Sequence, residues 1–378
     1  MILIYTIELN DLIKILRSLK FTILSGGVSK RKKLADKCSK CSWLLFCVML
    51  FTLFFFKTAY SQPTIGIGFL VRDKNDILIQ QAAQLAIEHA NAQGGYQGQK
   101  FELIIRSCDG PWGRTSKETV ALIYEDQVPI VVTALDGRNA HLAEQVTAKS
   151  HVVMLSTLSS DPTLSRAYVP WYFRMVPDDK QQSELLFKQI FENDEVQKTA
   201  FIAFDDYDGR MSSESFSERV IKAGYSKPVQ FIDFNEGELL DELHSSQFDV
   251  IVLAGYSEIA GSVIRQKAKS KLYAFQNLTN FMPIYDPVLF KKITFANSRA
   301  FDQNQWDHFQ QSFEEKFKSA PNPSMAYVYD GILLAVEAVK KYGPDSEDIR
   351  LGFKNLKFES ITGKIAFGDL GNRIFENL

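Results

Sequence analysis

Polar side chains gather directly after an apolar run that begins at Val152. The run of β-branched and aliphatic residues up to Leu155 predicts a buried parallel strand. Short polar residues then follow within six positions: Ser156, Thr157, Ser159, Ser160 and Asp161. Because ligands of open α/β sheets bind beyond the carboxyl ends of the strands, these side chains could hydrogen-bond a small solute. The local pattern is equally typical of a solvated turn before a proline.

Patterns of catalysis or metal binding are absent from the sequence. Asp205, Asp206 and Asp208 resemble part of a calcium loop, but the further oxygen ligands and the terminal Glu are missing, so we interpret them as turn residues. The chain has no nucleophile elbow, HExxH helix, Walker loop or complete GxGxxG, and its five histidines lack metal-ligand spacing. We therefore expect no enzyme activity, no metal and no cofactor.

The elements that position the polar loops alternate along the chain. In the first half, apolar strands alternate with helical patterns, at 64–70, 75–91, 101–106, 114–125, 129–133, 139–148 and 152–155. After residue 179 the alternation restarts, at 181–191, 199–204, 212–223, 229–231, 250–254, 258–269 and 271–275. This order predicts an α/β fold of two doubly wound parallel-sheet lobes, with a cleft that could close on a small molecule.

A targeting segment precedes these elements. A basic cluster at 30–33, a 14-residue apolar run at 43–56 and the small residues Ala59 and Ser61 predict a signal peptide over 28–61. The run is short for a membrane span, so cleavage before Gln62 is favoured over anchoring. We expect translation to start near Val28, which would make residues 1–27 an annotation artefact.

Charge and cysteine content restrict the partners of the mature chain. Residues 1–61 hold ten Lys and Arg and three acidic residues, which leaves a net charge of −9 on the rest. Such an acidic protein lacks the basic surface that a nucleic-acid partner requires. Cys108 is the only cysteine after the leader, so an intramolecular disulfide cannot form.

Eight segments, in order, resemble the branched-chain amino-acid type of periplasmic binding protein. The segments are NAQGGYQGQKFEL, the strand end at Cys108 and Asp109, LSTLSSDPTL, YFRMVPDDKQQ, FIAFDDYDGR, VLAGY, AYVYDGILLAVEAVKKYG and ITGKIAFGDLGN. The match as a whole covers essentially Gln62 to Asn372. The resemblance implies a type I periplasmic binding fold whose chain crosses between the lobes three times, near 174–178, 296–300 and 368–371. Lobe I would hold residues 62–176 and 300–367, and lobe II residues 177–299 and 368–378.

The same resemblance implies a function. The protein would be a monomer that captures a small polar solute, such as an amino acid, amide or carboxylate, in the periplasm and delivers it to an ABC permease. A periplasmic sensor or regulatory module, which would hand its closed form to a sensor protein of the inner membrane, remains an alternative. The sequence does not separate these two partners.

The resemblance also carries ligand-binding roles to six residues. In lobe I it implies Ser159 and Ser160 and, in the loop before the next helix pattern, Arg138 and Asn139. A helix N-terminus and a bidentate guanidinium both suit a carboxylate, although Asn139 could instead be a helix cap and Arg138 a solvated side chain. In lobe II it implies Tyr207 and Tyr256, whose rings could cover an apolar ligand.

Two departures from the family pattern bear on the ligand. Family members that bind α-amino acids place an acidic residue against the amine, and the matching stretch here, 276–281, has none. Without it an ammonium group inside a closed cleft would be poorly compensated, which puts an amino-acid ligand in doubt. The family's disulfide partner for Cys108 is also missing, since Asp136 stands at that position.

Overall fold

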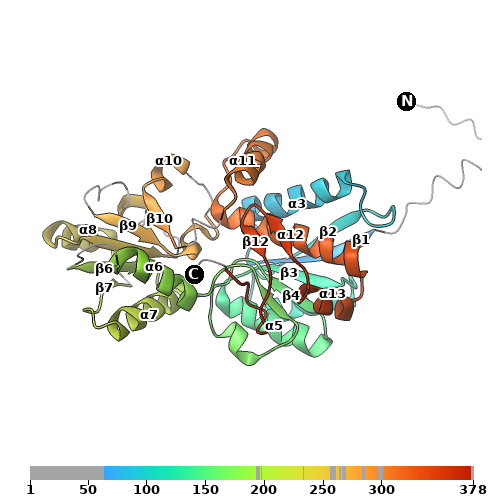
Figure 1. Ribbon diagram of the computed structural model, residues 1–378, viewed down its shortest axis with the longest axis horizontal. Coiled ribbons are helices and arrows are strands. Elements are labelled where there is room, and N and C mark those ends of the chain that lie inside the picture. The colour runs from blue at the N-terminus through green and yellow to red at the C-terminus, as the bar shows by residue number, and fades with distance from the viewer. Residues whose placement is uncertain are drawn as a thin grey trace, which may run out of the picture. The chain divides into compact units, whose positions relative to one another are not determined.

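Two five-stranded parallel sheets form the framework of the computed structural model (Figure 1). The structure describes residues 64–375, except 112, 193–195, 197, 233, 256–260, 264, 266–269, 283–285 and 297–300. The predicted signal peptide and residues 1–27 lie outside the described residues. Residues Pro63–Leu378 form one compact unit. The predicted α/β class, with parallel sheets in two lobes, is confirmed.

The first lobe is built on a sheet with the strand order β2-β1-β3-β4-β5. Its strands are β1 (Ile65–Val71), β2 (Phe101–Ser107), β3 (Ile130–Ala134), β4 (Val153–Ser156) and β5 (Tyr172–Arg174). Its helices are α3 (Ile77–Ala92), α4 (Arg114–Tyr124), α5 (Gly137–Ser150), the 3₁₀ turn η1 (Leu164–Ala167) and, from the C-terminal part of the chain, α11 (Gln303–Phe317), α12 (Pro323–Tyr342) and α13 (Ser346–Phe353). Strand β5 was not predicted from the sequence, because its three residues are too few to show a pattern.

Helices cover both faces of this sheet, since alternate strand residues point to opposite sides. Ile67 and Phe69 of β1 pack in one core with α3 and α12, whereas Leu70 packs in a second core with α4 and α5. Burial on both faces explains why the strands are apolar throughout rather than alternating.

The second lobe repeats the arrangement with the strand order β10-β9-β8-β6-β7. Its strands are β6 (Thr199–Ala203), β7 (Val229–Phe231), β8 (Val250–Ala254), β9 (Lys271–Ala274) and β10 (Ile293–Phe295). Its helices include α6 (Asp179–Phe191), α7 (Tyr207–Lys222), α8 (Glu236–Ser245), η2 (Gln276–Thr279) and α10 (Pro287–Phe290). Phe201 and Ile202 of β6 enter separate cores on the two faces of the sheet. Most of the helix expected at 258–269 lies outside the described residues.

The end of the chain returns to the first sheet. After the antiparallel hairpin of β11 (Phe358–Ser360) and β12 (Gly363–Ile365), Asn372 forms a parallel bridge with Arg174 of β5. We expected 368–378 in the second lobe, but its described part lies at the edge of the first sheet, where β5 offers free backbone groups. No helix among the described residues is long and apolar enough to cross a membrane.

Candidate functional site

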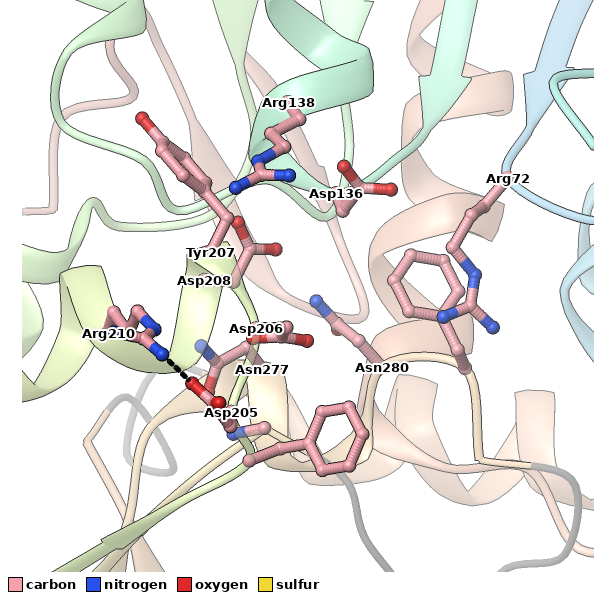
Figure 2. A pocket seen from close by; sticks show the side chains of 13 residues that line it. Arg72, Asp136, Arg138, Asp205, Asp206, Tyr207, Asp208, Arg210, Asn277 and Asn280 are labelled. Carbon is pink, nitrogen blue, oxygen red and sulfur yellow. Dashed lines mark hydrogen bonds and ion pairs between the residues drawn. The ribbon is translucent and has the colours of Figure 1, made fainter. Parts of the chain in front are cut away.

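A pocket of about 830 Å³ receives side chains from both lobes (Figure 2). Its lining comes from loops at the carboxyl ends of β1, β3, β6, β8 and β9, the edge at which ligands bind in open α/β sheets. The lining residues are Arg72, Asp136, Arg138, Phe204, Asp205, Asp206, Tyr207, Asp208, Arg210, Gly255, Asn277, Asn280 and Phe281.

The start of α5 forms the first-lobe side of the pocket. Asp136 caps this helix, because its Oδ1 accepts the backbone N–H of Asn139 at 3.0 Å. The side chain of Asn139 donates to Asp136 Oδ2 at 2.7 Å and accepts from the Thr115 hydroxyl at 2.5 Å. Asn139 is therefore used within the first lobe, and it does not line the pocket.

Arg138 lies beside Asn139 but points into the pocket (Figure 2). Its guanidinium carbon lies 5.5 Å from the centre of the Tyr207 ring, a cation–π contact. In the described part of the chain, Arg138 has no carboxylate within ion-pair distance. The other two pocket arginines are paired, Arg72 with Asp76 at 3.2 Å and Arg210 with Asp205.

The loop between β6 and α7 forms the second-lobe side. Asp206 caps α7, since its Oδ1 accepts the backbone N–H of Gly209 at 2.7 Å. Phe204 is 48% exposed, which is unusual for so large an apolar side chain. Across the pocket Phe281 has a φ of 58°, a left-handed conformation that is rare for a bulky residue and typical of functional sites. The loop thus offers apolar surface and carboxylates together.

The first two residues of α7 touch the first lobe. The Tyr207 hydroxyl donates to Asp161 Oδ2 at 2.8 Å, and Asp208 Oδ1 accepts the backbone N–H of Gly137 at 2.9 Å. Burial, together with the charge of Asp136, raises the pKa of Asp208 to about 8. The Asp208 carboxyl is therefore largely protonated at neutral pH.

The polar segment after β4 is buried rather than solvated. Every residue from Ser156 to Asp161 is at most 2% exposed. Ser159 Oγ has no hydrogen-bond partner among the described residues, and the backbone carbonyl of Ser160 accepts the N–H of Asp179 at 2.8 Å. Neither serine lines the pocket. The solvated-turn interpretation is wrong, because strands and helices of both lobes cover the segment.

The side-chain amides of Asn277 and Asn280, which line the pocket, already make hydrogen bonds within the protein. Asn277 accepts from the backbone of Gly255 at 3.0 Å and donates to the Ser212 hydroxyl at 2.9 Å. Asn280 donates to the Leu158 carbonyl at 3.2 Å and accepts from the Ser324 hydroxyl at 2.7 Å. These amides are therefore poor candidates for direct solute binding.

The structure thus brings together Arg138 and Tyr207 of the six predicted residues, and leaves Asn139, Ser159 and Ser160 outside the pocket lining. Tyr256 lies outside the described residues. Sequence reasoning missed Arg72, Phe204 and Asp206. The signal for Asp206 was present in the acidic run of the FIAFDDYDGR segment, which we interpreted only as turn chemistry.

Comparison with known proteins identifies relatives along most of the chain. A Leu/Ile/Val-binding protein homologue from Brucella suis biovar 1 is 25% identical over 228 residues, 57% of this chain and 60% of that protein. The chain thus spans about 60% of the length of this curated relative. The name of this relative refers to leucine, isoleucine and valine, and those ligands are attributed to the relative alone.

Solved structures share the fold at low identity. The substrate-binding protein LivJ from Streptococcus pneumoniae, in complex with isoleucine, superimposes with a TM-score of 0.68 at 19% identity, over 82% of this chain and 94% of that one. A solute-binding protein from Rhodopseudomonas palustris BisB5, in complex with 3,4-dihydroxybenzoic acid, gives 0.69 at 18% identity, over 82% and 91%.

The family assignment depends on the sequence profile. The profile described as periplasmic binding protein matches residues 77–377, which include the second lobe, the first lobe apart from β1, and every described residue of the pocket except Arg72. The resemblance seen in the sequence is thereby confirmed, and members of this family are solute-binding proteins rather than enzymes. The chain belongs to the periplasmic binding protein family.

Proposed function

We propose that this protein captures a small solute bearing a carboxylate in the pocket between its lobes, and delivers it in the periplasm to an ABC transporter. The observation that carries this proposal is the guanidinium of Arg138, which faces the pocket without an ion-pair partner among the described residues. Arginine binds carboxylates through two parallel hydrogen bonds, a geometry that selects the planar anion.

The charges around Arg138 support this choice. Asp205 is paired with Arg210, and Asp136 and Asp206 each spend an oxygen on capping a helix. Asp208 is largely protonated because burial raises its pKa to about 8. Arg138 is therefore the charged group of the pocket whose interactions are least complete, and a solute carboxylate would complete them.

The apolar part of the solute would lie against Phe204 and Phe281. The exposed ring of Phe204 would be covered by an aliphatic or aromatic body, which stabilises the complex by removing apolar surface from water. The two related structures described above contain isoleucine and 3,4-dihydroxybenzoic acid, both of which combine a carboxylate with such a body.

Asp206 bears on whether the pocket can also bind the amine of a solute. The stretch 276–281 lacks the expected acidic residue, but Asp206 reaches the same pocket from the loop after β6 and has one oxygen beyond its capping bond. A second-lobe carboxylate is thus available from a different loop, so the missing acidic residue no longer argues against an α-amino acid.

A thermal-shift screen tests the proposal. Isoleucine, leucine, benzoate and 3,4-dihydroxybenzoate are compared with isoleucinamide and benzamide, which have the same bodies without a carboxylate. Because a ligand that binds only the folded state raises the melting temperature, acids should raise it and their amides should not. The proposal fails if no acid does so, or if amides do so equally. An amino acid and its deaminated analogue then decide the role of Asp206.

Delivery to a transporter is tested separately. The solute-bound protein should stimulate ATP hydrolysis by the cognate permease complex in proteoliposomes. Stimulation of a histidine kinase in place of the permease would instead establish the sensor function.

A further inference from the structure

The start of α7 makes two hydrogen bonds to the first lobe. The Tyr207 hydroxyl donates to Asp161 Oδ2 at 2.8 Å, and the Gly137 backbone N–H donates to Asp208 Oδ1 at 2.9 Å. These bonds join α7 to the start of α5 and to the segment after β4. Neither bond involves a solute, so both can form in the empty protein.

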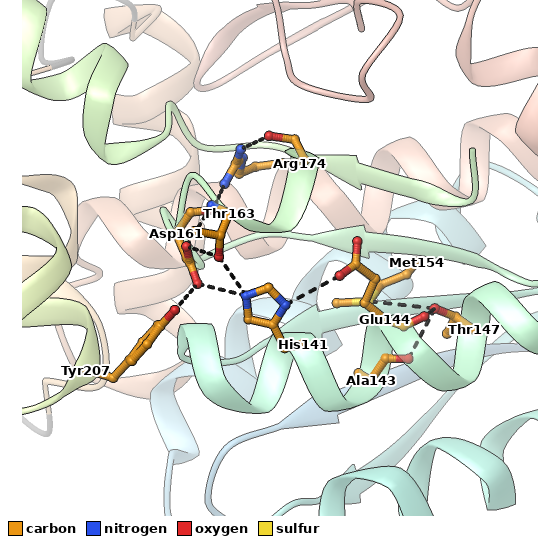
Figure 3. Close-up of polar contacts among 10 residues, drawn as sticks. His141, Ala143, Glu144, Thr147, Met154, Asp161, Thr163, Arg174 and Tyr207 are labelled. Atoms are coloured by element: carbon orange, nitrogen blue, oxygen red, sulfur yellow. Dashed lines mark hydrogen bonds and ion pairs between the residues drawn. The ribbon is translucent and has the colours of Figure 1, made fainter. Parts of the chain in front are cut away.

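Asp161 is held as an acceptor for the tyrosine (Figure 3). Its Oδ1 accepts the backbone N–H and the hydroxyl of Thr163 at 2.8 and 2.7 Å, and its Oδ2 lies 3.0 Å from Nε2 of His141. The hydrogen bonds from His141 and Thr163 outweigh burial and lower the pKa of Asp161 to about 2. The carboxylate is therefore ionised at neutral pH, and Thr163 and His141 hold it in place from the first lobe.

His141 completes this support from the solvent side. Hydrogen bonds to Asp161 and Glu144 raise the pKa of His141 to about 9, so its imidazole is protonated at neutral pH. The resulting positive charge offsets the burial of Asp161. Tyr207 meets a preformed, charged acceptor, and hydrogen bonds to charged groups are among the stronger ones.

Gly137 leaves no room for a side chain at this junction. A Cβ built at Gly137 would lie 2.7 Å from Asp208 Oδ1 and 2.9 Å from Tyr207 Cε1. Both atoms belong to the second lobe. The next atom, Asp161 Cβ of the first lobe, lies 3.1 Å away, so an alanine would keep one tight contact in either state. Its two closest contacts would exist only while the lobes are together, and separation of the lobes would relieve them.

We propose that Tyr207, Asp208, Asp161 and Gly137 form a latch that holds the two lobes together before a solute binds. This inference deepens the proposed function, on which it rests. Tyr207, which the resemblance identified as a ligand contact, becomes a positioning residue that sets how much of the empty protein is closed. The latch tunes affinity for all solutes, while Arg138 selects among them.

The expected effect of losing a latch bond follows from the strength of a hydrogen bond to a carboxylate. Loss of one hydrogen bond to an ionised carboxylate lowers the ratio of closed to open protein about tenfold. Apparent affinity scales with the fraction of binding-competent protein. Because the empty wild-type protein is mainly closed, this fraction falls by less than the ratio does, so the apparent Kd of a solute that binds the closed form rises by less than tenfold. The factor should be the same for every solute.

Distance measurements without solute test the latch directly. Spin labels on Gln145→Cys of α5 and Lys222→Cys of α7, both exposed, report the separation of the lobes by double electron–electron resonance, while the buried Cys108 stays unlabelled. In the empty protein we expect mainly the short distance of this structure. Tyr207→Phe and Gly137→Ala should each shift the distribution to longer distances.

A matched variant and a second readout keep the test decisive. Tyr124→Phe removes a hydroxyl that bonds Ser150 within the first lobe, at 3.1 Å, and should leave the distance unchanged. The proposal is overturned if the empty wild-type protein is open, or if both latch variants keep its distance distribution. Failure of every solute to bind would overturn the proposed function instead, since this measurement uses none. Circular dichroism confirms that each variant is folded.

Discussion

Two polar segments follow interior strands, each at the carboxyl edge of its own sheet, but one is buried and the other lines the pocket. The segment after β4, Ser156 to Asp161, is at most 2% exposed, whereas the loop after β6, from Phe204 to Arg210, lines the pocket. Both are polar, and both precede a helix or a helical turn. Strand-end position therefore shows where a crevice lies, but packing decides which loop is open to a solute.

Arg174 explains why the first loop is closed. This arginine, fully buried on β5, donates to the Asp161 carbonyl at 2.5 Å, to the Ser165 hydroxyl at 2.9 Å and to Asn372 at 2.7 Å. The Leu158 carbonyl in the same segment accepts from Asn280 of the second lobe. Among the described residues, the loop after β6 has no buried arginine across it, and its Phe204 is 48% exposed.

Removal of the buried Arg174 guanidinium should have the largest effect, because it takes away the group that closes the segment after β4. Arg174→Met leaves Asp178, Asn372 and the Asp161 carbonyl without their partner, and loss of one member of a buried ionic network costs about 3–5 kcal/mol. Urea denaturation measures the free energy of unfolding. Arg166→Met, at an exposed arginine of η1, is the matched control and should cost little. A loss below about 1 kcal/mol for Arg174→Met would show that the cover does not depend on it.

The affinity of the pocket for a carboxylate solute should depend on Arg138. Arg138→Gln removes the charge that faces the solute, so the Kd of a carboxylate solute should rise about 10- to 100-fold. Ser160→Ala, in the buried loop, should leave the Kd unchanged. Isothermal titration calorimetry with the best acid from the screen provides both values. Equal losses for the two variants would place the buried loop in the binding site after all.

The sequence predicted the fold well because the fold depends on patterns that are local and repeated. Apolar strands, helical spacing and an ordered resemblance were enough for two parallel-sheet lobes. The site was harder to predict, because Ser159 and Asn139 have side chains suited to a ligand, but Ser159 is buried and the Asn139 amide bonds to Asp136 and Thr115. Exposure of Phe204 and pairing of Arg72 arise only when distant segments meet, and no local pattern encodes them.

The pH dependence of stability should report on Asp208, which follows β6 and contacts the first lobe. Burial raises the pKa of Asp208 to about 8, with Asp136, Asp206 and Asp161 adding repulsion. The folded state therefore binds a proton more tightly than the unfolded chain, and Asp208 lowers stability as pH rises from about 4 to 8. Asp208→Asn should flatten this decline, because an asparagine does not titrate and the decline comes from the proton that the folded state retains. Thermal melts at pH 5 and pH 8 measure it, with Asp241→Asn at an exposed position as control. An unchanged slope would mean that Asp208 titrates as in water.

The smallest expected effect concerns the buried loop and has the opposite sign. Ser159 Oγ is buried without a hydrogen-bond partner among the described residues, so Ser159→Ala removes a desolvation penalty and should stabilise the fold by about 0.5–1 kcal/mol. Ser183→Ala is the matched control, because that buried hydroxyl donates to the Asp179 carbonyl at 2.6 Å and its loss should destabilise. Urea denaturation compares the two. If Ser159→Ala destabilises as much as Ser183→Ala, the Ser159 hydroxyl has a partner in solution, and the loop after β4 is less sealed than its burial indicates.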